Sequence, residues 1–136
     1  MKIQLLDWSE STVSFDFDDT LCLSTDGGNA PNPEIVSLLM KHHADGERCI
    51  IITARDPEHE SDEWIAENEP HRIKVSDFVR AHNLPVERVV FTNHEPKGPV
   101  CLRNNVRLHY DDREDEIVSC SGCGVKAIKV VQPCKG

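Results

Sequence analysis

The sequence has no long hydrophobic run and few aromatic residues. Among its 136 residues, hydrophobic residues make up 38% and aromatic residues 5%. No segment approaches the roughly 18 to 20 consecutive apolar residues that cross a bilayer. The first residues, Met1 to Asp7, also lack the apolar core and the small-residue cleavage site of a secretory signal. We therefore expect no membrane partner and a cytoplasmic location.

Positive charge is scarce. The sequence has 15 Lys and Arg residues against 24 Asp and Glu residues, and its formal net charge is -9 with neutral histidines. A protein that binds long nucleic acids needs many cationic contacts to phosphate groups. We therefore expect no extended nucleic-acid surface, although a single phosphate group can still bind where a metal ion and a few cations offset the negative field.

Repeats and low-complexity segments are absent, and the cysteines form no recognisable disulfide framework and no complete metal-binding pattern. A chain of this length fits one domain, residues 1–136. Six cysteines are present, but without a secretory signal we expect free thiols and not disulfides. Cys120 and Cys123 have the Cys-x-x-Cys spacing of zinc and redox sites. No second ligand pair accompanies them, so a structural role is favoured over a zinc site.

The sequence does contain an alternation of β-rich and helical patterns, which predicts an α/β fold with a largely parallel sheet. Ile50, Ile51 and Ile52 fit a strand that is buried on both faces between helices. Five core strands are predicted at 12–16, 48–53, 88–92, 106–110 and 126–131, with a further short candidate at 2–6. Helices are predicted at 34–44, 56–69, 76–82 (with Ser76 as N-cap) and 112–121, and residues 21–32 are predicted to form a loop or small flap.

Four groups of polar residues lie at or just after the carboxyl ends of predicted strands, the edge where open α/β sheets bind ligands. The groups are Asp16/Asp18/Asp19/Thr20, Thr53/Arg55, Lys97 and Asp111/Asp112. Two carboxylates about 4 Å apart repel each other by about 4 kcal/mol at an effective dielectric of 20, so a bound cation would stabilise such a cluster. Oxygen ligands of this type, together with a substrate phosphate, suit Mg²⁺.

Asp16 and Asp18 are two residues apart, so in an extended strand they share a face while Phe15 and Phe17 pack on the other. This spacing suits a nucleophile and its proton-transfer partner. We expect Asp16 to attack phosphorus, and Asp18 to protonate the leaving oxygen and then to activate water.

Three further residues are candidates for contacts to the phosphoryl group. Thr53 and Lys97 would donate hydrogen bonds and positive charge to the phosphoryl oxygens. Arg55 is a secondary candidate for substrate binding, because an ion pair with the acidic stretch that follows it is equally reasonable.

The segment Phe15-Asp16-Phe17-Asp18-Asp19-Thr20-Leu21 resembles the first motif of the haloacid dehalogenase (HAD) superfamily, apolar-D-x-D-x-T-[LV]. Residues 50–55 resemble its second motif, Lys97 fits its third, and residues 108–112 resemble its fourth, in the same order. The resemblance implies a Rossmann-like three-layer α/β/α sandwich and an aspartyl-phosphate intermediate. It also implies that Mg²⁺ is held by Asp16, the backbone carbonyl of Asp18 and one acid of the fourth motif, with Asp112 preferred over Asp111.

The resemblance extends to the reaction type. The acid at position 18 is typical of the phosphatases of the superfamily, whereas its ion pumps have Thr there and its dehalogenases lack the acid. The short interval after the first motif and the filled interval between Thr53 and Lys97 imply minimal or no cap. Residues 110–113, with the helix and strand that follow, are similar to polynucleotide kinase 3'-phosphatase domains and to some 5'-nucleotidases.

We therefore expect a Mg²⁺-dependent phosphatase that acts on a phosphorylated small molecule or on a nucleic-acid end. The resemblance favours nucleotides or 3'-phosphorylated ends, and the net charge favours a small metabolite. A non-catalytic phosphate-binding module of the same fold is the alternative from another class. No oligomeric state is predicted.

Overall fold

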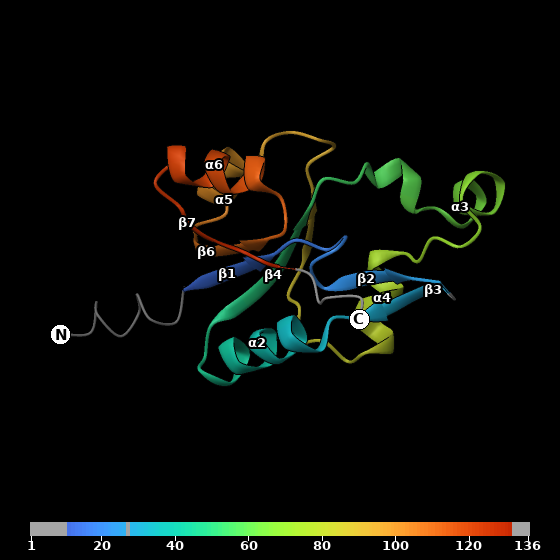
Figure 1. Ribbon diagram of the computed structural model, residues 1–136, viewed down its shortest axis with the longest axis horizontal. Coiled ribbons are helices and arrows are strands. Elements are labelled where there is room, and N and C mark those ends of the chain that lie inside the picture. Colours follow the sequence, from blue (N-terminus) through green and yellow to red (C-terminus); the bar gives the residue numbers. More distant parts are fainter. Residues whose placement is uncertain (1–10, 27, 132–136) are drawn as a thin grey trace.

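The computed structural model describes residues 11–26 and 28–131, so the strand candidate at 2–6 lies outside the described residues (Figure 1). A five-stranded sheet has the order β5-β4-β1-β6-β7, and every pairing in it is parallel. Its strands are β1 (Thr12–Phe15), β4 (Arg48–Thr53), β5 (Val89–Phe91), β6 (Val106–Asp111) and β7 (Lys126–Lys129). All five predicted core strands are confirmed.

Helices cover both faces of the sheet (Figure 1). They are α2 (Pro33–Ala44), the 3-10 helix η1 (Pro57–Glu60), α3 (Asp62–Asn68), α4 (Val75–Ala81), α5 (Lys97–Arg103) and α6 (Glu114–Gly122). The described residues include no helix with the length and apolar character that a membrane crossing requires.

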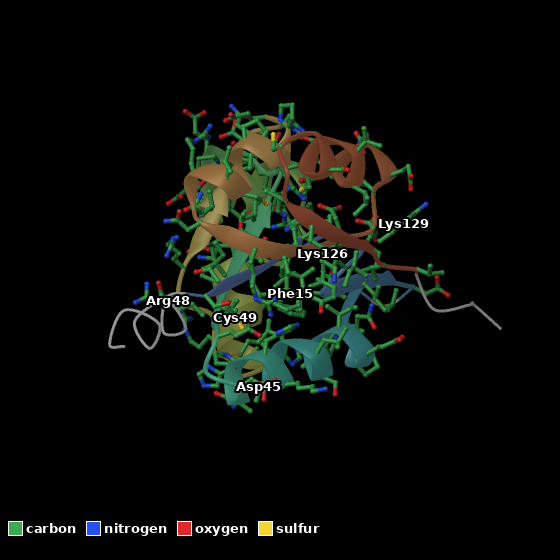
Figure 2. All side chains as sticks on the ribbon, turned by 90° about the vertical axis from the view of Figure 1, so that its left-hand side faces the viewer. Phe15, Asp45, Arg48, Cys49, Lys126 and Lys129 are labelled. Atoms are coloured by element: carbon green, nitrogen blue, oxygen red, sulfur yellow. The ribbon has the colours of Figure 1, made fainter. Side chains whose placement is uncertain are left out.

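Two hydrophobic cores hold the three layers together. Side chains alternate along β4, so Cys49 and Ile51 join the core with α2 and α4, while Ile50 and Ile52 join the core with α5 and α6. Phe15 and Cys49 lie between the sheet and α2 (Figure 2). Burying one such side chain contributes roughly 1.5–3 kcal/mol. The predicted three-layer α/β/α sandwich is thereby confirmed.

The segment after β1 forms a small antiparallel hairpin of β2 (Cys22–Thr25) and β3 (Gly28–Pro31). A tight turn starts it, because the amides of Thr20, Leu21 and Cys22 all donate to the carbonyl of Phe17, at 3.3, 3.1 and 3.0 Å. The predicted loop or small flap is thus a hairpin, and the described residues hold no separate cap domain.

Two helix predictions are wrong in detail. The predicted helix at 56–69 is split into η1 and α3, because the Ser61 side chain caps α3 by accepting a hydrogen bond from the Trp64 amide at 3.1 Å. Ser76 is not the N-cap of α4, which begins one residue earlier. The amide of Val75 is capped by Oε1 of Glu60 at 2.8 Å, from 15 residues away in sequence.

Helix α5 was not predicted. Prolines at 96 and 99 argue against a helix interior, but a proline in the first helical turn loses no intrahelical hydrogen bond. The amide of Gly98 donates to Oγ of Ser119 on α6 at 2.9 Å. As a result, Lys97 is the first residue of a helix packed against α6 and not part of a surface loop.

Candidate active site

Asp16 directly follows the central strand β1 and lies at the carboxyl edge of the sheet. Its amide donates to the carbonyl of Tyr110 on β6 at 2.9 Å, and its side chain is 7% exposed. Oδ1 accepts a hydrogen bond from Nζ of Lys97 at 2.7 Å, and Oδ2 accepts one from Oγ1 of Thr20 at 3.1 Å. Both carboxylate oxygens are therefore held in fixed positions.

Lys97 is almost fully buried and bridges two carboxylates. Nζ donates to Asp16 and to Oδ2 of Asp111, each at 2.7 Å. Burial alone would lower the pKa of Lys97, but the negative charges of Asp16 and Asp111 outweigh it and raise the pKa above its usual value. Lys97 is thus an ammonium at neutral pH. An ammonium has three N–H donors, and the two carboxylates accept from two of them.

The paired acids after β6 differ in environment. Asp111 is fully buried, and its oxygens accept hydrogen bonds from Lys97, from Nε2 of His109 at 2.8 Å and from the amide of Arg113 at 3.1 Å. Burial would raise the pKa of Asp111, but the His109 hydrogen bond and the Lys97 charge lower it to about 2. Asp112 is half-buried, and its Oδ1 lies 3.3 Å from Oγ1 of Thr20, whose one hydrogen is shared between Asp112 and Asp16.

Asp16, Asp111 and Asp112 form the one group of three or more potential metal ligands within residues 11–26 and 28–131. One oxygen from each lies within 4.8 Å of the others. Lys97 compensates only part of their charge. Burial raises the pKa of Asp16 well above its usual value, and the negative charge of Asp111 raises it further. An all-oxygen site with an excess of negative charge fits Mg²⁺.

Asp18 lies in the turn beyond the end of β1. The prediction that Asp16 and Asp18 share one face of an extended strand is therefore wrong. Its side chain is 53% exposed and is paired with Arg55, whose Nε and NH2 donate to its two oxygens at 2.9 and 2.8 Å. NH1 of Arg55 donates to Glu60 and to the carbonyl of Ile73, both at 2.9 Å. Arg55 therefore pairs both with the first motif and with the acidic stretch that follows it.

The cleft at this edge has a volume of about 290 Å³. Of the four polar groups named from sequence, the cleft is lined by Asp16, Asp18, Asp19, Arg55, Lys97 and Asp112. Thr53 and Asp111 are buried and are not part of the lining. The hydroxyl of Thr53 accepts a hydrogen bond from the amide of Arg55 at 3.3 Å, which leaves its hydrogen free to donate.

Several side chains around the cleft were not predicted. His59, Arg72 and Arg113 line it. The ring of His59 stacks on Trp64 with a centroid distance of 4.0 Å, and the guanidinium of Arg72 lies 5.5 Å from the centroid of that Trp64 ring. His59 and Arg72 come from segments without a recognisable motif, so only the folded chain reveals them, whereas Arg113 directly follows the fourth motif.

His109 was also missed, although the sequence held a signal for it. It is two residues before Asp111 on β6, and residues two apart on a strand share a face. Its Nδ1 lies 2.6 Å from Oγ of Ser14 on β1.

The cysteines form no metal site within the described residues, where all five are free thiols. Cys120 packs in the core with α5, and its sulfur lies 4.0 Å from that of Cys101. Cys123 is half-buried at the end of α6. This packing is consistent with a structural role for Cys120.

Comparison with known proteins gives no sequence-level match, because neither a protein-family model nor a curated protein is similar enough to the chain. Two solved structures of the Pnkp1/Rnl/Hen1 RNA repair complex contain a chain of similar fold. The first has a TM-score of 0.65 and 18% sequence identity, and the match covers 89% of this chain and 42% of the other. The second has a TM-score of 0.65 and 16% sequence identity, and the match covers 93% of this chain and 48% of the other. This chain thus spans less than half the length of those chains.

A HAD family enzyme from Bacteroides thetaiotaomicron, solved as a mutant in complex with magnesium and inorganic phosphate, is also similar. The TM-score is 0.54 with 10% identity, over 88% of this chain and 93% of that enzyme. At such low identities these likenesses establish the fold. The chain has the HAD-like fold that its motifs implied.

Proposed function

We propose that this HAD-like chain is a Mg²⁺-dependent phosphatase that hydrolyses phosphate monoesters through an aspartyl-phosphate on Asp16. The observation that carries the proposal is the contact of Asp16 with Lys97 inside the cleft, next to the acidic pair Asp111 and Asp112. A buried carboxylate held by an ammonium, with two more carboxylates beside it, has few structural uses but suits attack on a phosphoryl group.

Asp16 and Asp112, with the backbone carbonyl of Asp18, are the proposed holders of Mg²⁺. Asp111 is the alternative to Asp112, but its oxygens already accept hydrogen bonds from Lys97, His109 and Arg113. When bound, the ion neutralises charge on the carboxylates and on the phosphoryl group. The HAD family enzyme of the same fold that was solved with magnesium and inorganic phosphate supports this assignment.

The chain's own residues account for both halves of the reaction. An oxygen of Asp16 forms a bond to phosphorus, the bond from phosphorus to the leaving oxygen breaks, and Asp18 in its protonated form, outside its ion pair with Arg55, gives that oxygen its proton. The resulting Asp18 carboxylate then takes a proton from water as the water oxygen attacks phosphorus, the bond from Asp16 to phosphorus breaks, and inorganic phosphate leaves with Asp16 free. Lys97 and Thr53 donate hydrogen bonds to the phosphoryl oxygens.

Arg55 has a positioning role in this scheme. Its bidentate contact holds the exposed Asp18 at the rim of the cleft. It also lines the cleft itself, so a contact to the phosphoryl group is part of the proposal.

Hydrolysis of p-nitrophenyl phosphate with and without Mg²⁺ tests the function. We expect Mg²⁺-dependent turnover that Asp16→Asn reduces by at least about 10³-fold, with the fold retained by circular dichroism. Asp45→Asn is the matched control, because Asp45 is exposed at the end of α2 (Figure 2) and does not line the cleft. Full activity of Asp16→Asn would refute the nucleophile. Absence of turnover with any phosphate ester, despite binding of inorganic phosphate, would favour a non-catalytic module.

A second candidate is removal of 3'-phosphates from nucleic-acid ends. The similarity to RNA repair chains over 89% and 93% of this chain favours it, while the net charge of -9 favours small metabolites. The test compares a 3'-phosphorylated oligonucleotide with mononucleotides and sugar phosphates at equal concentration. A lower kcat/KM for the oligonucleotide than for the small esters would reject this candidate.

A further inference from the structure

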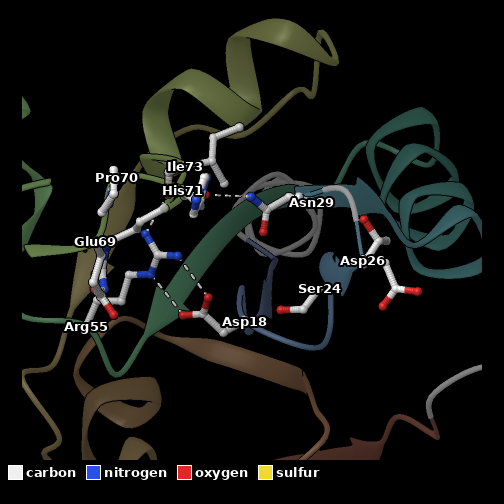
Figure 3. Close-up of a pocket in the computed structure, with 12 residues that line it drawn as sticks. Asp18, Ser24, Asp26, Asn29, Arg55, Glu69, Pro70, His71 and Ile73 are labelled. Carbon is white, nitrogen blue, oxygen red and sulfur yellow. Dashed lines mark hydrogen bonds and ion pairs between the residues drawn. The ribbon is translucent and has the colours of Figure 1, made fainter. Parts of the chain in front are cut away.

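A second concavity, which we call the groove, opens beside the cleft between the β2–β3 hairpin and residues 69–73. Its volume is about 600 Å³, and it shares Asp18, Arg55 and Arg72 with the cleft. The Asp18–Arg55 pair lies near Ser24 of the hairpin (Figure 3). The two concavities therefore meet at the residue that is proposed to protonate the leaving oxygen.

The two walls of the groove are tied together. Nδ2 of Asn29 on the hairpin donates a hydrogen bond to the carbonyl of His71 at 3.2 Å (Figure 3). Arg55 also donates a hydrogen bond to the carbonyl of Ile73 in the second wall, residues 69–73. These contacts hold the groove in shape before any ligand enters, as is usual for small-molecule sites.

The charges in the groove determine what it can accept. Three carboxylates line it, those of Asp18, Asp26 and Glu69, against the two guanidiniums of Arg55 and Arg72. Both guanidiniums are already in ion pairs, Arg55 with Asp18 and Arg72 with Glu69 at 2.9 Å. A second phosphate in the groove would lie among carboxylates, and such like-charge contacts oppose binding.

We propose that the groove binds the leaving group, and that it favours a neutral, hydroxyl-bearing one such as the ribose of a nucleoside over one with a second phosphate. The carboxylates of Asp26 and Glu69 are hydrogen-bond acceptors that suit sugar hydroxyls, and Ser24 has both a donor and an acceptor. The inference rests on the proposed phosphatase function, because the role of Asp18 as acid places the leaving oxygen where cleft and groove meet.

The test compares removal of the 3'-phosphate from adenosine 3'-monophosphate and from adenosine 3',5'-bisphosphate, which differ by one remote phosphate. We expect the monophosphate to have a kcat/KM about tenfold higher or more, the size of effect that modest charge repulsion produces. The double variant Asp26→Asn/Glu69→Gln should reduce this ratio to about threefold or less. Equal use of both esters by the native protein, or an unchanged ratio in the double variant, would overturn the inference.

The matched control is Glu63→Gln/Glu67→Gln, which removes two exposed charges from α3 that line neither the cleft nor the groove. Its ratio should equal that of the native protein, and a ratio reduced as far as in the groove variant would assign the effect to overall charge and overturn the inference. If no ester is hydrolysed, the proposed function fails while the groove remains testable. Titration of ¹⁵N-labelled protein with adenosine should then give saturable shifts at the amides of Gly28, Asn29 and His71, and the absence of such shifts would refute the groove.

Discussion

Nε2 of His109 lies 2.8 Å from Oδ2 of Asp111, and both side chains are completely buried. A carboxylate only accepts hydrogen bonds, so Nε2 carries the hydrogen and Nδ1 accepts one from the hydroxyl of Ser14 at 2.6 Å. Burial lowers the pKa of His109, so the ring is neutral at physiological pH. His109 thus fixes the same oxygen of Asp111 that receives the ammonium of Lys97.

We predict that His109→Leu lowers kcat on p-nitrophenyl phosphate by about 10- to 100-fold with little change in KM, because the hydrogen bond of His109 positions Asp111, which in turn holds Lys97 against Asp16. Mg²⁺ affinity, measured by calorimetry, should weaken over a similar range. His109→Gln keeps an amide donor toward Asp111 and should restore most of both. A His109→Leu protein with native kcat and Mg²⁺ affinity would show that His109 only fills space.

The contacts of His109 show which parts of the site could be predicted from sequence. Asp16 and Asp111 end neighbouring parallel strands, so a period-two pattern and the order of the motifs were sufficient to bring them to one edge. The isoleucine run of β4 likewise predicted a parallel sheet covered by helices, whereas the three-layer sandwich was implied by the resemblance to the HAD superfamily. Local rules are sufficient where the partners lie on regular, adjacent strands.

Contacts between irregular segments could not be predicted. The pair of Asp18 and Arg55 joins residues 37 apart, both located beyond the end of a strand. The start of α4 depends on Glu60, and that of α5 on packing against Ser119. In each case a tertiary contact satisfies a backbone or charged group that sequence reasoning assigns to a local partner.

Gly98 should be irreplaceable by alanine. A Cβ there would collide with the backbone carbonyl of Ser119 and lie 2.7 Å from its Oγ, and backbone cannot move aside cheaply. We predict that Gly98→Ala lowers the free energy of unfolding in urea by about 2 kcal/mol or more, despite the better helix propensity of alanine. Gly122→Ala, near the end of α6 with open space around it, is the matched control and should change stability by less than about 1 kcal/mol. Equal effects of the two substitutions would contradict the close packing of α5 on α6.

The two acids of the fourth motif should separate into a metal ligand and a structural acid. Asp112→Asn is expected to weaken Mg²⁺ binding by about tenfold or more, with little loss of stability. Asp111→Asn removes the negative charge beside buried Lys97 and should lower the free energy of unfolding by about 3 kcal/mol. Calorimetric Mg²⁺ titration and urea unfolding of both variants test this. The reverse pattern, with Asp111→Asn stable but unable to bind Mg²⁺, would assign the metal to Asp111.

Glu47, which does not line the cleft, should make the free energy of unfolding depend on pH. Its carboxylate accepts hydrogen bonds from Nε of Arg107 at 2.6 Å and from Oγ of Ser11 at 2.9 Å, and contacts Nδ1 of His42 at 2.8 Å. Burial would raise the pKa of Glu47, but these hydrogen bonds lower it below its usual value of 4.5. A pKa lower in the folded state means that the stabilisation is complete above pH 4.5 and is lost as the pH falls through the folded-state pKa.

Glu47→Gln should therefore lower the free energy of unfolding by about 1–2 kcal/mol at pH 7, and the difference from the native protein should shrink steadily below pH 4.5. Urea unfolding at a series of pH values measures this. Glu87→Gln is the control, because Glu87 is exposed and its ion pairs with Arg48 and Arg88 should contribute less than about 1 kcal/mol. A difference for Glu47→Gln that stays constant from pH 7 to pH 3 would mean that its hydrogen bonds do not favour the ionised carboxylate, because only a shifted pKa links the substitution to protons.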